Sequence, residues 1–353
     1  MSKLTVAIIG FGRAGKRFYQ ALTSAPANEL YEIVAIIDAN ATAISGINAI
    51  PCYSCIEEAL LEHKPSTVVL SVNEEQHYEV LEIVVKFSSI KSIICEKPLT
   101  KTLEELLKIK PLLSPIKTTV NFCERYSRIV EDGLTWLKAH APTVTRIEFS
   151  WGKYRVKDPR PTMGVLSEIS HALDLSFLFS LQYEPTFKVV SANTTHSDFS
   201  ISGDRIDDSV SLLALINDIP LVGRSSFVLP YRERVFILYA RSADGRDTYQ
   251  LQFNFDNPRW DDDQLTVYKV APLGGKREVL LSKNYRSDEL DASLRHIKKL
   301  SDYLVDVWNA SHQPEHVHKY ADFNDAERIQ VALAELDASS VSMEKLQLFR
   351  ELV

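Results

Sequence analysis

The sequence feature that most constrains the fold is the stretch TVAIIGFGRAG at residues 5–15. Residues 5–9 are β-branched or apolar and predict a buried strand, whereas residues 16–22 predict a helix. The turn between them has the pattern G-x-G-x-x-G and consists of Gly10, Phe11, Gly12, Arg13, Ala14 and Gly15. In this order Gly10 permits a sharp turn, Gly12 lets a pyrophosphate approach the backbone, and Gly15 lets the helix pack closely. We therefore predict a dinucleotide-binding site with its phosphates at the helix N-terminus; the alternative is a glycine-rich turn in an unrelated α/β fold.

The length and charge of the chain restrict the class of protein further. Its 353 residues suggest two domains, since a domain averages about 150 residues. The net charge of −7 argues against a nucleic acid or an anionic membrane as the main partner. No apolar run is long enough to span a membrane, and the first predicted strand starts too early for a signal peptide to precede it. We therefore expect a cytoplasmic protein.

Two of the four cysteines form a C-x-x-C pair at Cys52 and Cys55. No second pair of this kind and no nearby pair of histidines completes the ligand spacing of a zinc site. The sequence therefore predicts no metal site. We expect reduced, structural cysteines, with a redox pair as the alternative.

The second predicted strand, residues 31–38, ends in an acidic residue. Asp38 stands where an acid can accept hydrogen bonds from the ribose hydroxyls of the adenosine. Its carboxylate would repel a 2′-phosphate, and the following Ala39 and Asn40 provide no cation to hold one. The sequence therefore predicts NAD rather than NADP as the cofactor. The alternative role for Asp38 is that of a helix cap or turn residue.

Two further predicted strands, residues 67–72 and 92–95, lead into segments with candidate site residues, because ligands of open α/β sheets collect at the carboxyl ends of strands. The candidates for cofactor binding there are Ser71, Val72, Asn73, His77, Glu96 and Lys97. A lone histidine such as His77 is more often structural. A lysine at the end of such a strand points into the nicotinamide crevice, and Pro98 biases Lys97 away from helical conformation. We therefore predict that Lys97 is catalytic.

The pattern changes in the second half of the chain. Residues 144–153 alternate in polarity and predict the first strand of a new sheet. Turn-forming residues separate further strand-like runs, which predicts an antiparallel meander over residues 187–192, 208–216, 221–228, 234–240 and 249–255. The acidic residues 261–263 predict a solvated turn. Helices are predicted at residues 290–308 and from Asp322 or Asn324 onwards.

A helix predicted at residues 163–180 carries a second group of candidate residues. Glu168, His171 and Asp174 follow one another at intervals of three, so acids and an imidazole lie close together on the helix. His171 and Asp174 are also i, i+3 neighbours that could touch. A single histidine on a helix is more often structural, but the adjacent acids favour a functional role. We predict that His171 acts as a general base or acid.

Several motifs occur in a characteristic order: the glycine turn, Asp38, the loop at residues 71–73, Glu96-Lys97-Pro98, NFCERY at residues 121–126 and GVLSEISHALD at residues 164–174. In this order they resemble the Gfo/Idh/MocA family of oxidoreductases. Members are two-domain NAD(P)-dependent dehydrogenases that act mostly on sugars, inositols and nucleotide sugars.

The resemblance implies an α/β fold with two domains. Residues 1–122 would form a Rossmann domain with a doubly wound parallel sheet. Residues 123–353 would form an α+β domain for substrate binding, with an open, mainly antiparallel sheet. In the family this sheet often builds the oligomer interface, so we expect a homodimer or a homotetramer.

The resemblance also implies a reaction, which is hydride transfer between nicotinamide and a secondary hydroxyl or keto carbon of a sugar-like substrate. Lys97 would hold the oxygen and, together with His171, relay its proton. Arg125 and Tyr126 would face the substrate. Two other functions stay open on the same fold: a nucleotide-sensing regulator that has lost catalysis, and a reductase of a non-sugar imine or enone.

Two positions depart from the family pattern. Cys123 stands where an asparagine is common, and Ser167 stands where an aspartate usually precedes the histidine by four residues. The nearest acids are Glu168 and Asp174. Either of them could be the residue that orients His171 or accepts a hydrogen bond from a substrate hydroxyl.

Overall fold

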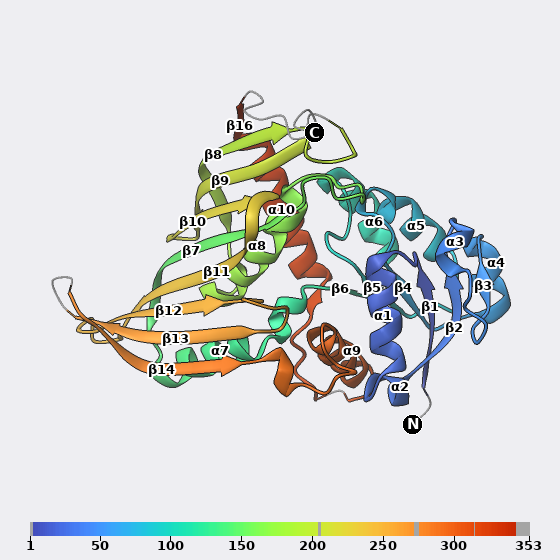
Figure 1. Ribbon diagram of the computed structural model, residues 1–353, viewed down its shortest axis with the longest axis horizontal. Helices are drawn as coiled ribbons and strands as arrows, with labels where there is room; N and C mark the ends of the chain where they lie inside the picture. Colours follow the sequence, from blue (N-terminus) through green and yellow to red (C-terminus); the bar gives the residue numbers. More distant parts are fainter. Residues whose placement is uncertain (1–2, 204–205, 272–274, 314, 344–353) are drawn as a thin grey trace. The chain divides into compact units, whose positions relative to one another are not determined.

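The computed structural model describes residues 3–203, 206–271, 275–313 and 315–343 (Figure 1). The chain divides into two compact units. Unit 1 consists of Met1–Tyr126 and Asp291–Val331, and unit 2 consists of Ser127–Leu290 and Ala332–Val353. Relative to the expected domains, residues 1–122 and 123–353, the first unit also includes residues 123–126 and 291–331.

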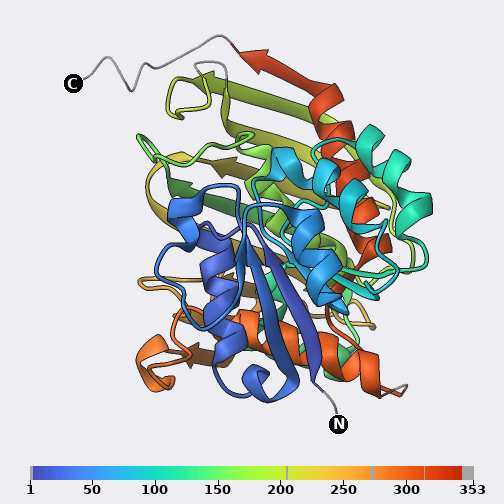
Figure 2. The ribbon, with the colours of Figure 1, turned by 90° about the vertical axis from the view of Figure 1, so that its right-hand side faces the viewer.

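Unit 1 is built on a sheet with the strand order β15-β6-β5-β4-β1-β2-β3. Its strands are β1 (Leu4–Ile9), β2 (Tyr31–Ile37), β3 (Cys52–Tyr53), β4 (Thr67–Leu70), β5 (Ser92–Cys95), β6 (Lys117–Val120) and β15 (Ala321–Asp322). β15 pairs antiparallel with β6, and the other pairs are parallel; Figure 2 shows β1 and β2 side by side in blue. The chain reverses its direction of winding between β1 and β4, which confirms the doubly wound sheet. Ligands of such sheets bind at this reversal.

Helices connect the strands of unit 1. They are α1 (Arg13–Thr23), α2 (Ala27–Leu30), α3 (Ala41–Ile44), α4 (Ile56–His63), η1 (Glu74–Gln76), α5 (His77–Val84), α6 (Leu103–Leu113), η2 (Cys123–Tyr126) and α9 (Lys298–His312). α1 follows the glycine turn directly and buries one apolar face, which includes Phe18 and Leu22. The site-bearing loops thus begin where buried strands end.

Residues 291–331 join unit 1 through apolar packing and strand pairing. α9 buries Tyr303 and Leu304 in the same core as Ile8 and Phe18. The hydroxyl of Tyr31 donates a hydrogen bond of 2.7 Å to the carbonyl oxygen of Leu304. The predicted helix at residues 290–308 is therefore present only in part, because residues 292–297 form turns before α9 begins.

Unit 2 is built on a second sheet with the order β14-β13-β12-β11-β7-β10-β9-β8-β16. Its strands are β7 (Thr143–Tyr154), β8 (Phe187–Ser197), β9 (Ile206–Ile216), β10 (Ile219–Ser226), β11 (Val228–Arg241), β12 (Thr248–Asn254), β13 (Asp263–Val270), β14 (Arg277–Tyr285) and β16 (Ser340–Met343). The sheet is mainly antiparallel, as predicted. It is not a simple meander, however, because β7 lies between β10 and β11 and pairs in parallel with β10.

The helices of this second part of the chain are α7 (Arg128–His140), α8 (Leu166–Ser180), η3 (Ser287–Glu289) and α10 (Phe323–Ser339), the last of which crosses the unit boundary. α8 is almost entirely buried, and its Phe179 lies against Phe236 and Phe253 of the sheet. Trp151 of β7 is fully buried beside the same helix. The alternating polarity of β7 arises because one of its faces packs on this aromatic core.

The acidic residues 261–263 correct one expectation. They are buried rather than solvated. Asp262 accepts hydrogen bonds from Ser287, and Asp263 accepts one from Ser127. Buried carboxylates need such donors, and the donors come from segments distant in sequence. Separately, no helix in the described ranges is both long and apolar enough to cross a membrane.

Candidate functional site

The glycine turn has the geometry that a dinucleotide needs. Gly10 has a φ of +89°, and a Cβ atom there would lie 2.5 Å from the backbone nitrogen of Val72. A Cβ atom on Gly15 would lie 2.0 Å from the carbonyl oxygen of Gly10, whereas one on Gly12 would meet nothing within 4 Å. Two glycines therefore permit the fold, and the third leaves open space beside the backbone. A phosphate group fits this arrangement at the start of α1.

A groove of about 630 Å³ lies beside this turn. Its lining includes Arg13, Lys16 and Arg17 from α1, together with Asn40 and Thr42 from the segment after β2. Three cations line the groove, and none of its lining residues is acidic. The groove is therefore suited to negatively charged groups, and the role of Arg13 in cofactor binding stays a prediction.

Asp38 follows the end of β2 and connects it to the glycine turn. Its Oδ2 accepts a hydrogen bond of 2.6 Å from the backbone N–H of Phe11, and its Oδ1 accepts one of 2.8 Å from that of Asn40. Asn40 in turn caps α3 by accepting from the N–H of Thr42. A carboxylate has about four lone-pair sites. Asp38 can therefore hold the turn in place and still accept hydrogen bonds from ribose hydroxyls.

His77 links two loops that the sequence assigned to cofactor binding. Its Nδ1 lies 2.8 Å from the carbonyl oxygen of Pro98, and its Nε2 lies 3.3 Å from that of Val72. The ring is fully buried, and this burial lowers the pKa of His77. A neutral imidazole carries one N–H, so one of the two contacts is a donated hydrogen bond. His77 therefore holds the loop at residues 71–73 next to the turn that carries Lys97.

The backbone on both sides of Lys97 is fixed. The N–H of Glu96 donates to the carbonyl oxygen of Leu70 at 2.9 Å, and the carboxylate of Glu96 accepts from the side-chain amide of Asn121 at 2.8 Å. On the other side, the carbonyl oxygen of Pro98 contacts His77. The side chain of Lys97 itself is half-buried. These contacts hold Lys97 at the carboxyl end of β5, where the sequence placed it.

Ser71 fastens the neighbouring loop to the glycine turn. Its hydroxyl donates to the carbonyl oxygen of Gly10 at 2.8 Å, and its backbone N–H donates to that of Ile9 at 2.8 Å. Asn73 precedes η1 and makes no side-chain capping bond to it. The carboxyl ends of β1, β4 and β5 are therefore connected through backbone groups.

Arg125 and Tyr126 make specific contacts within unit 1. Arg125 is buried, and its guanidinium donates to Asp325 at 2.9 Å. The hydroxyl of Tyr126 donates to Asp306 at 2.6 Å. Burial, reinforced by the Asp306 charge, raises the pKa of Tyr126 far above its ordinary value. Both side chains thus have internal partners, and their role in substrate binding stays a prediction.

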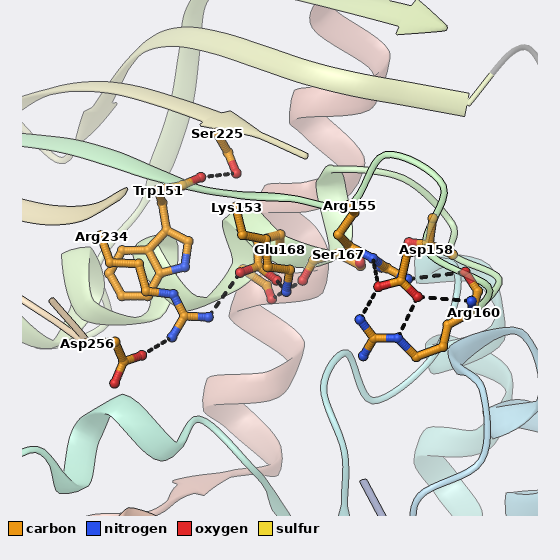
Figure 3. Close-up of polar contacts among 12 residues, drawn as sticks. Trp151, Lys153, Arg155, Asp158, Arg160, Ser167, Glu168, Ser225, Arg234 and Asp256 are labelled. Carbon is orange, nitrogen blue, oxygen red and sulfur yellow. Dashed lines mark hydrogen bonds and ion pairs between the residues drawn. The ribbon is translucent and has the colours of Figure 1, made fainter. Parts of the chain in front are cut away.

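The candidate residues of unit 2 lie on α8. His171, Glu168 and Asp174 are all buried there. The ring of His171 stacks on that of Trp151 with 6.1 Å between centroids. Glu168, which is 2% exposed, accepts from Lys153 through Oε2 at 2.5 Å and from Arg234 through Oε1 at 3.1 Å. Both oxygens of the Glu168 carboxylate therefore contact cations (Figure 3).

The cations around Glu168 belong to a wider network that sequence reasoning missed. Arg234 also donates to Asp256 at 2.6 Å, and Asp158 contacts both Arg155 and Arg160 (Figure 3). The guanidinium of Arg160 holds the pKa of Asp158 well below its usual range. The basic run KYRVKDPR at residues 153–160 was a signal that could have identified part of this network. The residues around Arg234 gave no signal of its contact with Glu168, because β11 brings Arg234 to Glu168 from a distant part of the sequence.

The described residues contain no group of three or more His, Cys, Asp or Glu side chains that could hold a metal ion. The ligand chemistry that the geometry does support is that of a dinucleotide at the glycine turn. The strand order, the open space at Gly12 and the cationic groove together define unit 1 as a dinucleotide-binding Rossmann unit.

The family model agrees with this class. Residues 4–120 match the Gfo/Idh/MocA model, described as an oxidoreductase family with an NAD-binding Rossmann fold. Over these residues the chain is similar to the Gfo/Idh/MocA oxidoreductases, and this match confirms the resemblance found in the sequence. Among curated proteins, no sequence matches the chain significantly.

Solved structures extend the likeness of fold to most of the chain. A levoglucosan dehydrogenase in complex with NADH and levoglucosan is 17% identical, with a TM-score of 0.74 over 96% of this chain and 97% of that chain. UDP-N-acetylglucosamine 3-dehydrogenase GnnA from Acidithiobacillus ferrooxidans is 15% identical, with a TM-score of 0.70 and coverages of 96% and 98%. The transcriptional regulator Gal80p from Kluyveromyces lactis is 13% identical, with a TM-score of 0.73 and coverages of 96% and 89%. One fold therefore includes both dehydrogenases and a regulator.

Proposed function

We propose that this chain is an NAD-dependent dehydrogenase that transfers hydride between nicotinamide and a secondary hydroxyl or keto carbon of a sugar, an inositol or a nucleotide sugar. The observation that carries this proposal is the connection of the glycine turn to Lys97. Ser71 fastens the loop after β4 to Gly10, and His77 fastens the same loop to the turn at Pro98. Lys97 is therefore held at the same sheet edge as the dinucleotide turn.

Each candidate residue has a proposed task. A bound nicotinamide supplies the centre that accepts or gives the hydride. Lys97 stabilises the substrate oxygen, and His171 takes or returns the hydroxyl proton. Because both oxygens of Glu168 contact cations, we assign it to holding Lys153 and Arg234. Asp174, one turn beyond His171, is then the acid proposed to orient the imidazole.

The proposed preference for NAD rests on Asp38. Its carboxylate lies at the end of β2, and a 2′-phosphate would bring a second negative charge against it. The cations Arg13, Lys16 and Arg17 favour phosphates in general. Because NAD and NADP share the pyrophosphate, these cations do not distinguish the two cofactors. Discrimination between the two cofactors therefore falls to the repulsion at Asp38.

A direct titration with NADH and with NADPH tests the cofactor assignment. Energy transfer from the tryptophans to the bound nicotinamide reports binding. Tight binding of NADH with weak binding of NADPH is the expected result. A preference for NADPH would overturn the role of Asp38 and keep the dehydrogenase, whereas failure of both cofactors to bind would contradict the enzyme proposal.

A regulatory function is the second candidate, and the similarity of fold to the regulator Gal80p favours it. As a nucleotide-sensing regulator, this chain would bind the dinucleotide without turnover. A panel of sugars, inositols and nucleotide sugars, together with an imine and an enone, separates the candidates when NADH formation or consumption is followed. Turnover of a sugar-like compound supports the dehydrogenase, turnover of only the imine or enone favours the other reductase, and binding without turnover favours the regulator.

The proposed oligomer is a homodimer or a homotetramer formed through the open sheet of unit 2. On the face away from α8, a groove of about 490 Å³ is lined by residues that include Leu213, Val222, Val235 and Ile237. Such apolar side chains on an exposed sheet face are suited to contact with a second copy. Sedimentation of Val235→Asp against the unchanged chain tests this proposal, and an unchanged mass would contradict it.

A further inference from the structure

The sheet of unit 1 consists of two similar halves. Its order β15-β6-β5-β4-β1-β2-β3 places β1, β2 and β3 on one side of the reversal and β4, β5 and β6 on the other. In doubly wound sheets of this order each half binds one mononucleotide of a dinucleotide. The glycine turn and Asp38 belong to the first half, which is the proposed place of the adenosine. The second half is then the one that faces the nicotinamide mononucleotide.

Each half carries one carboxylate directly after its middle strand. Asp38 follows β2, which ends at Ile37, and Glu96 follows β5, which ends at Cys95. The two acids therefore hold equivalent positions in the two halves. An acid in the position of Asp38 accepts hydrogen bonds from ribose hydroxyls. By the same geometry, the position of Glu96 suits the second ribose of the dinucleotide.

Different kinds of group hold the two carboxylates in place. Asp38 accepts from two backbone N–H groups, at 2.6 and 2.8 Å. Glu96 accepts from a side chain, because the amide of Asn121 donates to its Oε1 at 2.8 Å. The backbone N–H of Asn121 also donates to the carbonyl oxygen of Cys95 at 2.8 Å. Asn121, the first residue after β6, thus contacts the end of β5 through both its backbone and its side chain.

One oxygen of the Glu96 carboxylate stays available to a ligand. No hydrogen bond within the described part of the chain reaches its Oε2, and the side chain is only half-buried, so solvent can reach it. Because Asn121 holds Oε1, the orientation of the whole carboxylate is restrained. A side chain that is ordered before its ligand arrives loses less conformational entropy on binding. Glu96 is therefore prepared to accept a hydrogen bond from a hydroxyl group.

A purely structural role does not account for Asn121. The residue is 6% exposed, and its Oδ1 has no hydrogen-bond partner among the described residues. A buried acceptor without a donor costs free energy, and this cost offsets what the bond to Glu96 contributes to stability. An asparagine at this position therefore adds little net stability, but it does determine where the carboxylate of Glu96 lies.

We infer that Asn121 is a positioning residue of the cofactor site, which fixes Glu96 so that its carboxylate accepts hydrogen bonds from the hydroxyls of the nicotinamide ribose. This inference rests on the proposed function, because it requires NAD at the glycine turn. It assigns one acid to each ribose of the dinucleotide. Asp38 is held for its ribose by backbone groups, and Glu96 is held for the other by Asn121.

Calorimetric titration of the full chain with NADH and with ADP tests the inference. ADP has the adenosine ribose and lacks the nicotinamide ribose. Asn121→Ala should weaken NADH binding about tenfold, because the carboxylate of Glu96 must then be ordered as NADH binds. The affinity for ADP should stay unchanged. A merely structural role of Asn121 would not separate the two ligands.

A second variant and a control guard against an effect on folding. Asn121→Leu keeps a similar volume and removes the amide together with its unpartnered oxygen, so it should fold and still weaken NADH binding about tenfold. Asn309→Ala is the control, since Asn309 lies on α9 of the same unit and contacts Gln313. It should leave both affinities unchanged. Melting temperatures of the three variants report whether folding is intact.

A double variant tests whether Asn121 acts through Glu96. Glu96→Ala should itself weaken NADH binding at least tenfold, since a hydrogen bond to a charged group is lost. In that background Asn121→Ala should cause no further loss, because residues that act as one unit are not additive. Two independent roles would instead give losses that multiply.

Three results would overturn the inference. They are an unchanged affinity for NADH in both Asn121 variants, an equal loss of NADH and ADP binding, and losses that multiply in the double variant. Each of them leaves the dehydrogenase proposal in place. Failure of the unchanged chain to bind NADH would contradict the dehydrogenase proposal and this inference together, so the two failures are distinguishable.

Discussion

The glycine turn of unit 1 and the ion pairs around Glu168 in unit 2 are built in different ways. The glycine turn is formed by the backbone itself. Gly10 and Gly15 let neighbouring backbone segments pack closely, and Gly12 leaves open space beside the backbone. Around Glu168, the long side chains of Lys153 and Arg234 come from separate strands and contact buried carboxylates. A backbone site is specified by a few adjacent residues, whereas a side-chain site depends on how the sheet is assembled. The comparison predicts that a substitution at Gly12 affects cofactor binding, whereas loss of a cation beside Glu168 affects the stability of unit 2.

The largest expected effect concerns Lys97, the proposed catalytic side chain held by the backbone contacts of unit 1. Lys97→Ala leaves those contacts intact and removes the ammonium, so turnover should fall about a thousandfold while NADH still binds. Steady-state kinetics and the NADH titration measure the two quantities. Lys101→Ala is the control, since Lys101 pairs with Glu75 at the surface. Substantial residual turnover in Lys97→Ala would remove Lys97 from its role.

The next largest effect separates cofactor binding from folding at the glycine turn. Gly12→Val should lower NADH affinity at least tenfold, because its side chain would occupy the space through which a pyrophosphate approaches. It should leave the melting temperature unchanged, since nothing in the protein lies within 4 Å of the added Cβ. Gly275→Val is the matched control, with equally open surroundings. Undiminished NADH binding by Gly12→Val would show that the open space serves another purpose.

A third effect, on stability rather than on activity or cofactor binding, tests the ion pairs around Glu168. Arg234→Met removes the cation that contacts both Glu168 and Asp256, and breaking a buried ion pair of this kind costs about 3 kcal/mol of unfolding free energy. Arg246→Met at the exposed turn should change it by less than about 0.5 kcal/mol. Urea unfolding followed by tryptophan fluorescence measures both. Equal stabilities of the two variants would mean that the network around Glu168 contributes little to the fold.

The smallest effect is a pH dependence in unit 1. The ammonium of Lys117 donates to the carbonyl oxygen of Val307 and to Ser311, and burial lowers the pKa of Lys117 to about 8 from an ordinary value of 10.5. Between these pH values the unfolded chain binds more protons than the folded one, so Lys117 favours folding increasingly as the pH rises.

The matched variant isolates this contribution. Lys117→Met should lack this pH-dependent gain in unfolding free energy. The stability of the unchanged chain should therefore increase relative to that of the variant from pH 8 to pH 10.5. Unfolding free energies of the two chains at several pH values measure it. A constant difference across this range would show that Lys117 keeps its ordinary pKa in the fold.

The sequence predicted the parts of the site that adjacent residues specify. The glycine turn, Asp38 at the end of β2 and Lys97 at the end of β5 all occupy the predicted positions, because a strand, a turn and a helix follow one another along the chain. The family assignment followed from the same motifs. His77 was identified as a candidate, but only the structure shows that it connects two loops.

What the sequence could not predict depends on contacts between distant segments. The acids at residues 261–263 appeared suited to a solvated turn, and they are buried because Ser127 and Ser287 supply donors from elsewhere in the chain. Residues 291–331 return to unit 1 because α9 completes its apolar core. The position of β7 between β10 and β11 likewise follows from pairing over long distances.

The sequence by itself therefore determined the dinucleotide turn and the alternation of strands and helices in unit 1, since short-range backbone geometry and the period of apolar residues encode them. Only the tertiary structure decided which charges meet. Arg234 is 66 residues from Glu168, and the two are brought together because β7 and β11 pair and α8 packs on that face of the sheet. Because both side chains are buried, loss of either partner would be costly: a carboxylate removed from water needs a cation or a hydrogen-bond donor beside it.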